Sequence, residues 1–190
     1  MKFIDAKTIQ IDRTLNPIDE FTLAFIEILE KHTPYVIISG YVAILFGRNR
    51  STEDIDVIIP TCTKEAFFSL HKDLLSHGYW CINVEDIEEL YDLLTSKHSI
   101  RFAVEPSLSP NVEIKFAKDH YDSVALQHPL TILIGGKQLK TSLLELQIAY
   151  KEEVLKSNKD LEDAKHIREV AEGYLNLALL NHYKKELHEK

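Results

Sequence analysis

Two aspartates separated by a single residue are the part of the sequence best suited to chemistry. Asp54 and Asp56 open the run Asp54-Ile-Asp-Val-Ile-Ile59, whose later residues are apolar and which Pro60 ends. This composition predicts a strand that is polar where it begins and buried where it ends. Because alternate residues of a strand point to the same face, the two carboxylates are expected to project side by side, while Ile55 points into the core.

A carboxylate pair of this kind can bind a divalent cation. Two neighbouring negative charges favour a cation between them, and a few oxygen ligands left open to water and phosphate suit Mg²⁺ or Mn²⁺. Such ions can polarise a phosphate, activate an attacking oxygen and stabilise departing pyrophosphate. Taken alone, the pair has an equally simple explanation as a solvated or salt-bridged acidic pair at a strand end.

The segment before the aspartates predicts a phosphate-binding turn. Residues 35–39 form a short run rich in β-branched side chains, and residues 40–47 have the length and flanking glycines of a short buried helix. This strand, turn and helix would bring backbone N–H groups to the end of the sheet where the aspartates lie, and glycine allows a ligand to approach the backbone closely. We therefore expect Ser39 and Gly40 to hold phosphate oxygens.

The turn that leads into the aspartate strand adds a cation and a hydroxyl. Arg50, and less directly Arg48, could bind a triphosphate through two N–H groups at once, and Thr52 could hydrogen-bond beside it. The alternative is that Arg50 only offsets the charge of the two aspartates. That alternative is compatible with catalysis.

The order of these residues resembles the nucleotidyltransferase superfamily, which has the polymerase-beta-like fold. The likeness is closest to the AbiEii-like group, the abortive-infection toxins and their small prokaryotic relatives, and is strong over residues 35–60. It is carried by a glycine-marked helix and a Gly-x-x-Arg-x-Thr-x-Asp-Ile-Asp run, which here read Ser39-Gly40-Tyr41-Val42-Ala43, then Gly47, Arg50, Thr52 and Asp54-Ile55-Asp56.

The chain departs from the family pattern at two positions of the glycine-marked turn. Ser39 stands at the first position of the usual glycine pair, where it can still offer a hydroxyl to phosphate but has less backbone freedom. Tyr41 replaces a smaller residue, which predicts either a shifted nucleotide or a partly filled pocket. The chain is also shorter than the toxins, which leaves the acceptor and toxicity open.

The resemblance implies further site residues downstream. Family members carry a third carboxylate on a neighbouring strand, and Glu113 would take that place as metal ligand or general base; an exposed edge-strand glutamate is the alternative. By likeness to the family's helix-borne lysine and Lys-Asp-x-x-Asp segment, Lys151 would neutralise nucleotide phosphates. Asp163 would orient that lysine or close the site. Surface salt bridges explain these last two residues as simply.

The activity that the resemblance implies is a metal-dependent transfer of a nucleoside monophosphate from an NTP, such as ATP, with release of pyrophosphate. The acceptor hydroxyl or phosphate stays open among RNA such as tRNA, a protein and a small molecule. Two alternatives use the same fold: a nucleotide-binding or regulatory module without turnover, and a toxin held by an antitoxin. The metal and catalytic residues would be Asp54, Asp56 and Glu113, and the nucleotide-binding residues Ser39, Gly40, Arg50, Thr52, Lys151 and Asp163.

Apolar periodicity predicts the elements that position these residues. Apolar side chains at three-and-four spacing predict helices over residues 19–32, 63–77 and 85–95, and strands are expected over 79–84, 99–104 and 111–116. Residues 130–134 and 137–140 predict a hairpin across Gly135-Gly136. Thereafter we expect a helix capped by Thr141 or Ser142, with Glu145 completing a capping box, and one long helix from about Lys159 to Ala178.

The expected fold class is therefore α/β (α+β), a small mixed β-sheet with flanking helices and a helical C-terminal portion. We expect a nucleotidyltransferase core over residues 1–140, with helices over 141–190 packed on it as part of one domain.

Composition excludes some classes of partner. A formal charge of -8 argues against a protein that coats nucleic acid by general electrostatics. No run approaches the roughly 20 apolar residues of a membrane span, so no membrane partner is expected. Two cysteines without metal-ligand spacing, Cys62 and Cys81, are typical of packing residues in a reducing cytoplasm.

Overall fold

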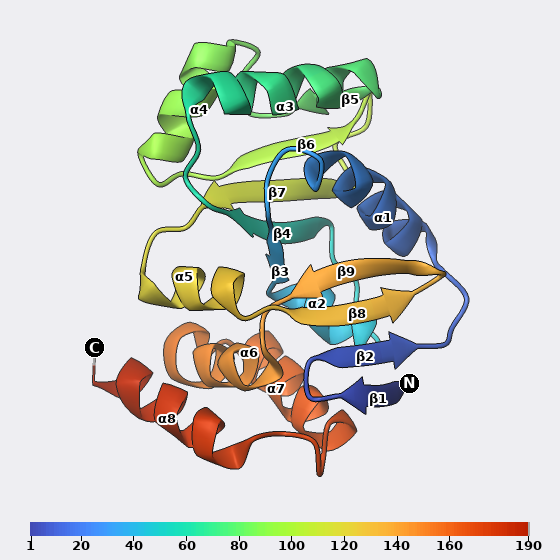
Figure 1. Cartoon of the computed structure of the whole chain (residues 1–190), viewed down its shortest axis with the longest axis vertical. Helices are drawn as coiled ribbons and strands as arrows, with labels where there is room; N and C mark the ends of the chain where they lie inside the picture. The colour runs from blue at the N-terminus through green and yellow to red at the C-terminus, as the bar shows by residue number, and fades with distance from the viewer. Residues whose placement is uncertain (190) are drawn as a thin grey trace.

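The computed structural model describes residues 1–189, which form one nine-stranded mixed sheet with helices around it (Figure 1). The strands follow the order β1-β2-β8-β9-β3-β4-β7-β6-β5. Their bounds are β1 Lys2–Asp5, β2 Thr8–Ile11, β3 Val36–Ile38, β4 Asp54–Ile59, β5 Tyr79–Cys81, β6 Ile100–Val104, β7 Asn111–Phe116, β8 Leu130–Ile134 and β9 Lys137–Thr141. The α/β class expected from the sequence is confirmed.

Helices lie at both ends of this sheet. In Figure 1, α3 and α4 lie at the end formed by β5 and β6, and α6, α7 and α8 gather at the opposite end, beyond β8. The bounds are α1 Pro17–Leu29, α2 Gly40–Leu45, α3 Lys64–Ser76, α4 Ile87–Thr95, α5 His120–Gln127, α6 Leu144–Tyr150, α7 Asn158–Val170 and α8 Leu177–His188. A π-helical turn, Lys151–Leu155, follows α6 directly.

The middle of the sheet fixes the relative positions of three segments. Strand β4 runs parallel to β7, with Asp56 opposite Glu113, and antiparallel to β3, with Ile38 opposite Asp56. The second half of β4 is buried, as its β-branched composition predicts. The polar start of β4 therefore lies next to the end of β3 and a polar position of β7.

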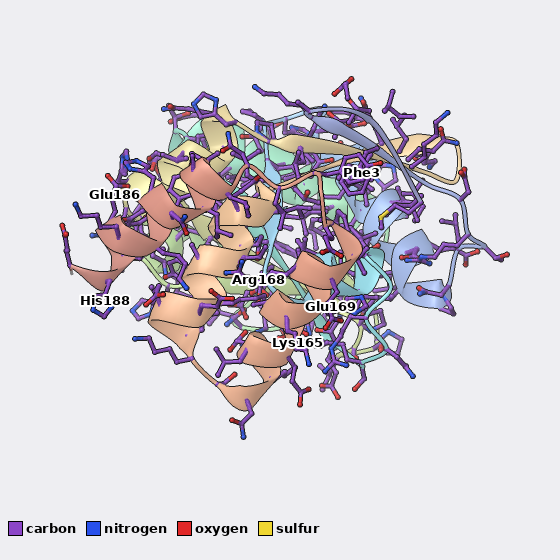
Figure 2. The ribbon with its side chains drawn as sticks, turned by 90° about the horizontal axis from the view of Figure 1, so that it is seen from below. Phe3, Lys165, Arg168, Glu169, Glu186 and His188 are labelled. Atoms are coloured by element: carbon purple, nitrogen blue, oxygen red, sulfur yellow. The ribbon has the colours of Figure 1, made fainter. Side chains whose placement is uncertain are left out.

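Ion pairs tie the C-terminal helices to the π-helical turn. Glu152 accepts hydrogen bonds from the Arg168 guanidinium of α7, 2.7 Å and 2.8 Å, and pairs with Lys184 of α8 at 2.9 Å. Glu153 pairs with Lys184 and with His188. Figure 2, seen from below, shows Arg168 and His188 on the two helices that flank this turn. These contacts fix α7 and α8 around the segment that carries Lys151.

Three segments differ from the sequence-based prediction. The strands β1 and β2 and the helix α5 were not expected, because the two strands have only four residues each and α5 shows little apolar periodicity. Strand β2 pairs antiparallel with β1 and joins the rest of the sheet by pairing in parallel with β8, which is distant in the sequence. Long-range pairing thus decides the N-terminal structure.

The predicted cap of the helix after the hairpin is wrong. Thr141 ends β9, and α6 begins after Leu143 without a side-chain cap. Ser142 instead accepts a hydrogen bond from the side chain of Gln147, and the Glu145 carboxylate accepts one from the backbone N–H of Asn176, 2.7 Å away. These polar groups find tertiary partners, which a local motif cannot reveal.

The single long C-terminal helix is also wrong, because the chain breaks it into α7 and α8. Helix α7 ends at Val170, and Gly173 takes a φ of 82° in the turn that follows, a conformation that favours glycine. The Asn176 side chain then caps α8 by accepting from the N–H of Leu179.

Among residues 1–189, none of the helices combines the length and apolar character required to cross a bilayer.

Candidate active site

The structure brings the three predicted carboxylates to one face of the sheet. Asp54 and Asp56 are alternate residues of β4, and Glu113 lies directly opposite Asp56 on the parallel neighbour β7. Each side chain is partly buried. Register neighbours on adjacent strands share a face, so the carboxylates point to the same side of the sheet.

Asp56 occupies an unfavourable place for a negative charge. Burial raises the pKa of Asp56 to about 6, and the charges of Glu113 and Asp54 act in the same direction. A hydrogen bond with the Ser39 side chain and the positive charge of Lys115 oppose this shift without cancelling it. A cation bound near Asp56 would relieve both the burial cost and the repulsion.

Glu113 differs from Asp56 because it has a cationic partner. The Arg101 Nε donates a hydrogen bond to Glu113 Oε2 at 2.8 Å from the adjacent strand β6. Burial raises the pKa of Glu113, but hydrogen bonds from Ser99 and Arg101 outweigh it, so the pKa lies below its usual value. Glu113 is therefore ionised, and Arg101 holds it.

These carboxylates are ligands of the type that binds divalent cations, but they do not form a complete metal-coordination site. Asp54 and Asp56 offer hard carboxylate oxygens from one face of β4, as Mg²⁺ or Mn²⁺ requires. Within the described part of the chain, no group of three or more His, Cys, Asp or Glu side chains is gathered closely enough to hold a metal ion. Glu113 would have to leave Arg101 to join the aspartates.

The turn between β3 and α2 presents Gly40 next to an arginine. A Cβ at Gly40 would lie 2.9 Å from Arg50 Nη2 and 3.1 Å from Arg50 Cζ. Glycine is needed here because the guanidinium packs against the backbone. Thr52 lies two residues after Arg50 in the loop between α2 and β4, and its hydroxyl donates to the carbonyl of Asp54 at 3.0 Å. The predicted residues Gly40, Arg50 and Thr52 therefore do lie together.

A buried charge cluster stands behind this arginine. Asp163 is 0% exposed and accepts from Arg50 Nη1 at 2.5 Å and from Lys151 Nζ at 3.0 Å, both at Oδ2. Lys151 is 1% exposed and also donates to Asp160 Oδ1 at 3.0 Å. Arg48 contacts Asp163 Oδ1 at 3.6 Å. The structure thus places Lys151 and Asp163 together, inside the protein, as a support for Arg50.

A polar cleft of about 550 Å³ opens in front of these groups. It is lined by Ser39, Gly40, Arg50, Ser51, Thr52, Glu53, Asp54, Asp56, Leu155, Lys159 and Asp160. Lys159 is exposed, and among residues 1–189 no hydrogen bond or ion pair engages its ammonium. Lys159 is the lysine of the Lys-Asp-x-x-Asp segment, of which the family resemblance assigned a role only to Asp163.

A second hollow of about 240 Å³ adjoins the cleft and is more apolar. Its walls include Ile58, Tyr121, Leu146 and Tyr150, together with Lys115. The two hollows share Ser39, Asp56 and Leu155. Asp56 thus lies at the boundary between the polar cleft and the largely apolar hollow.

Tyr41 does not enter either hollow, so the prediction of a partly filled pocket is wrong. Its side chain is fully buried, and its hydroxyl donates to Asp19 Oδ1 at 2.8 Å. Arg13 pairs with the same carboxylate. The first turn of α2 therefore uses Tyr41 to hold α1.

Comparison with known proteins supports the fold. The sequence matches no protein-family model and no curated protein. Among solved structures, an antigenic nucleotidyltransferase-like protein from Paracoccidioides brasiliensis aligns over 90% of this chain and 86% of its own, with a TM-score of 0.52 and 16% identity. The antibiotic-resistance factor ANT(2'')-Ia aligns over 90% of this chain and 93% of its own, with a TM-score of 0.53 and 15% identity.

The fold is that of the nucleotidyltransferases. ANT(2'')-Ia has also been solved with adenylyl-2''-tobramycin, and that structure aligns with a TM-score of 0.50 at 13% identity. At these identities the likeness concerns the nucleotidyltransferase fold, and the narrower resemblance to the AbiEii-like group stays a prediction.

Proposed function

We propose that the protein is a metal-dependent nucleotidyltransferase that moves a nucleoside monophosphate from an NTP to an acceptor hydroxyl or phosphate. The observation that carries the proposal is that Asp54 and Asp56 line the cleft that also holds Gly40 and Arg50, with Glu113 directly opposite Asp56 on β7. In the reaction a bond forms between the acceptor oxygen and the α-phosphorus. The bond from that phosphorus to the bridging oxygen breaks, and pyrophosphate leaves.

The carboxylates are the metal-binding part of the proposal. Asp54 and Asp56 would hold Mg²⁺ or Mn²⁺, which when bound would neutralise phosphate charge and polarise the α-phosphate. Glu113 would serve as a further ligand or accept the proton of the acceptor, and its ion pair with Arg101 keeps it deprotonated for either role.

The opposite wall of the cleft is the phosphate-binding part. Arg50 packs against the Gly40 backbone and is held there by Asp163, so its guanidinium meets a triphosphate without first being ordered. Lys151, engaged by two aspartates, would support this arrangement through Asp163 rather than touch the nucleotide. Lys159, at the cleft wall without a partner among the described residues, is the cation placed to contact phosphate directly.

A labelling experiment tests the activity. The protein is incubated with Mg²⁺ or Mn²⁺ and each of four α-labelled NTPs, with total RNA, cell protein and a small-molecule extract offered separately as acceptors. We expect one acceptor class to gain label together with pyrophosphate release. Asp56→Asn should abolish the label, whereas Asp92→Asn, an exposed carboxylate on α4, should not. Absence of label and of pyrophosphate from every combination would contradict the proposal.

A nucleotide-binding module without turnover is the second candidate, and the hold of Arg101 on Glu113 favours it. It predicts that calorimetry detects NTP binding while no acceptor produces pyrophosphate. The toxin alternative, with an antitoxin as partner, rests on the AbiEii-like resemblance. Growth arrest on expression, relieved by Asp56→Asn, would support it.

A further inference from the structure

Ser39 adopts a backbone conformation that side chains other than glycine rarely take. Its φ is 65° and its ψ is -136°, in the turn between β3 and α2. This region is costly for a residue with a Cβ and is seen mainly where the surrounding structure enforces it. Serine at a helix start ordinarily uses its hydroxyl as a cap, yet the Ser39 side chain makes no capping bond with α2. Neither backbone preference nor capping explains a serine here.

Gln147 of α6 hydrogen-bonds to the backbone of Ser39 in this turn. The backbone N–H of Ser39 donates to Gln147 Oε1 at 3.2 Å, and Gln147 Nε2 donates to Ser142 Oγ at 2.5 Å. The N–H of Ser142 in turn donates to the carbonyl of Ile37 at 3.0 Å, on β3. Gln147 and Ser142 are buried, so these hydrogen bonds are shielded from water, and they lead back to β3, the strand that precedes Ser39.

The turn places the Ser39 side chain beside the carboxylates. Ile38 lies opposite Asp56 in the β3–β4 register, so the next residue, Ser39, stands beside it. Ser39 and Asp56 line both the polar cleft and the apolar hollow. The Ser39 hydroxyl lies close enough to the Asp56 carboxylate to lower the pKa of that carboxyl as a hydrogen-bond partner. A residue without a hydroxyl would leave that carboxylate free to turn.

We propose that Gln147 is a positioning residue that holds Ser39 in this strained turn, so that the Ser39 hydroxyl fixes the direction of the Asp56 carboxylate between the two hollows. The role of Asp56 in this inference rests on the proposed function. The clamp of Gln147 on Ser39 rests on the contacts alone.

A double-mutant cycle in stability tests the clamp without any assay of activity. Ser39→Gly should raise the melting temperature by a few degrees, because glycine adopts the turn without strain. Gln147→Leu should lower the melting temperature of the wild-type protein, and should lower that of the Ser39→Gly variant less, because the turn of that variant needs no enforcement. An equal loss in both backgrounds would overturn the clamp.

Binding of Mn²⁺ and of ATP with Mg²⁺, measured by calorimetry, tests the effect on Asp56. Ser39→Ala keeps the strain and loses the hydroxyl, whereas Ser39→Gly loses both. Both variants should weaken Mn²⁺ binding about tenfold or more, the loss usual when a residue that orients a metal ligand is removed. Gln147→Leu should weaken binding similarly, and Gln147→Glu, which keeps an acceptor for the Ser39 N–H, should restore most of it.

The outcomes separate the two proposals. Unchanged Mn²⁺ affinity in both Ser39 variants would overturn the positioning role. A wild-type protein that binds neither Mn²⁺ nor ATP would refute the proposed function, while the stability cycle would still decide whether Gln147 clamps Ser39. Since Ser39→Gly is expected to stabilise the fold, a loss of binding in that variant cannot be attributed to unfolding.

Discussion

Asp56 on β4 lies directly opposite Glu113 on β7, in the register of two parallel strands. Glu113 has Arg101 as a partner on its other side, whereas the charges that act most on Asp56 are those of Glu113 and Asp54. One carboxylate is therefore neutralised within the protein, and the other is left buried beside negative charge. This asymmetry makes Asp56 the place where a bound cation would stabilise the site most.

Gly40→Ala is expected to displace Arg50. The new Cβ would come within 2.9 Å of the guanidinium, which cannot simply swing away because Asp163 holds it. The KM for the NTP should rise about tenfold, as for the loss of a charge-assisted phosphate contact. In an Arg50→Ala background the same glycine substitution should have little further effect. Equal KM increases in both backgrounds would show that the Gly40→Ala substitution does not act through Arg50.

Lys151→Met should destabilise the fold. The substitution leaves Asp160 and Asp163 without the ammonium that lies 3.0 Å from each, and breaking a buried pair in this way costs about 3–5 kcal/mol. Urea unfolding measures the loss. A stability equal to that of the wild type would show that the cluster is not a structural support.

Lys159→Met is the matched change at an exposed lysine of the same region. Because no partner among residues 1–189 engages its ammonium, the free energy of unfolding should stay within about 0.5 kcal/mol of the wild type. The KM for the NTP should still rise severalfold, since the side chain lines the cleft. An unchanged KM would show that Lys159 does not bind the phosphates of the NTP.

Asp19 should make stability depend on pH in the acid range. Burial raises its pKa, but hydrogen bonds from Arg13, the Asn16 backbone and Tyr41 outweigh this effect and hold the pKa below its ordinary value. A carboxyl with a depressed folded-state pKa contributes stability above its unfolded pKa, near 4, and loses it as the pH falls through the folded value. Urea unfolding at pH 7 and pH 3 should therefore show a smaller acid loss for Asp19→Asn than for the wild type.

The control for this pH dependence is Asp92→Asn, at an exposed site on α4. Its acid loss should equal that of the wild type. If Asp19→Asn lost as much stability on acidification as the wild type does, the hydrogen bonds to Asp19 would not favour its ionised form.

The local parts of the fold and site could be predicted from the sequence. Strand β4, helix α2 and the hairpin of β8 and β9 follow from apolar patterning and glycines, and the shared face of Asp54 and Asp56 follows from strand geometry. Glu113 came from a family resemblance, because one acidic residue in a strand has no pattern of its own.

What depends on distant contacts could not be predicted. The burial of Lys151 requires α7 to bring two aspartates to it, and the roles of Ser142 and Gln147 appear only once α6 packs beside β3. Tyr41 was expected near the nucleotide, but its hydroxyl finds a buried partner on α1. In each case a polar side chain forms its hydrogen bonds with residues distant in the sequence, and the local spacing of residues does not indicate those partners.

Pyrophosphate release by wild-type protein and by Asp56→Asn, with Mg²⁺ and the preferred NTP and acceptor, tests the central claim most directly. The wild type should release pyrophosphate in step with acceptor labelling, and the variant should be slower by about a hundredfold or more while it keeps the wild-type melting temperature. If the folded Asp56→Asn variant turned over at the wild-type rate, the carboxylates of β4 would not form the active site.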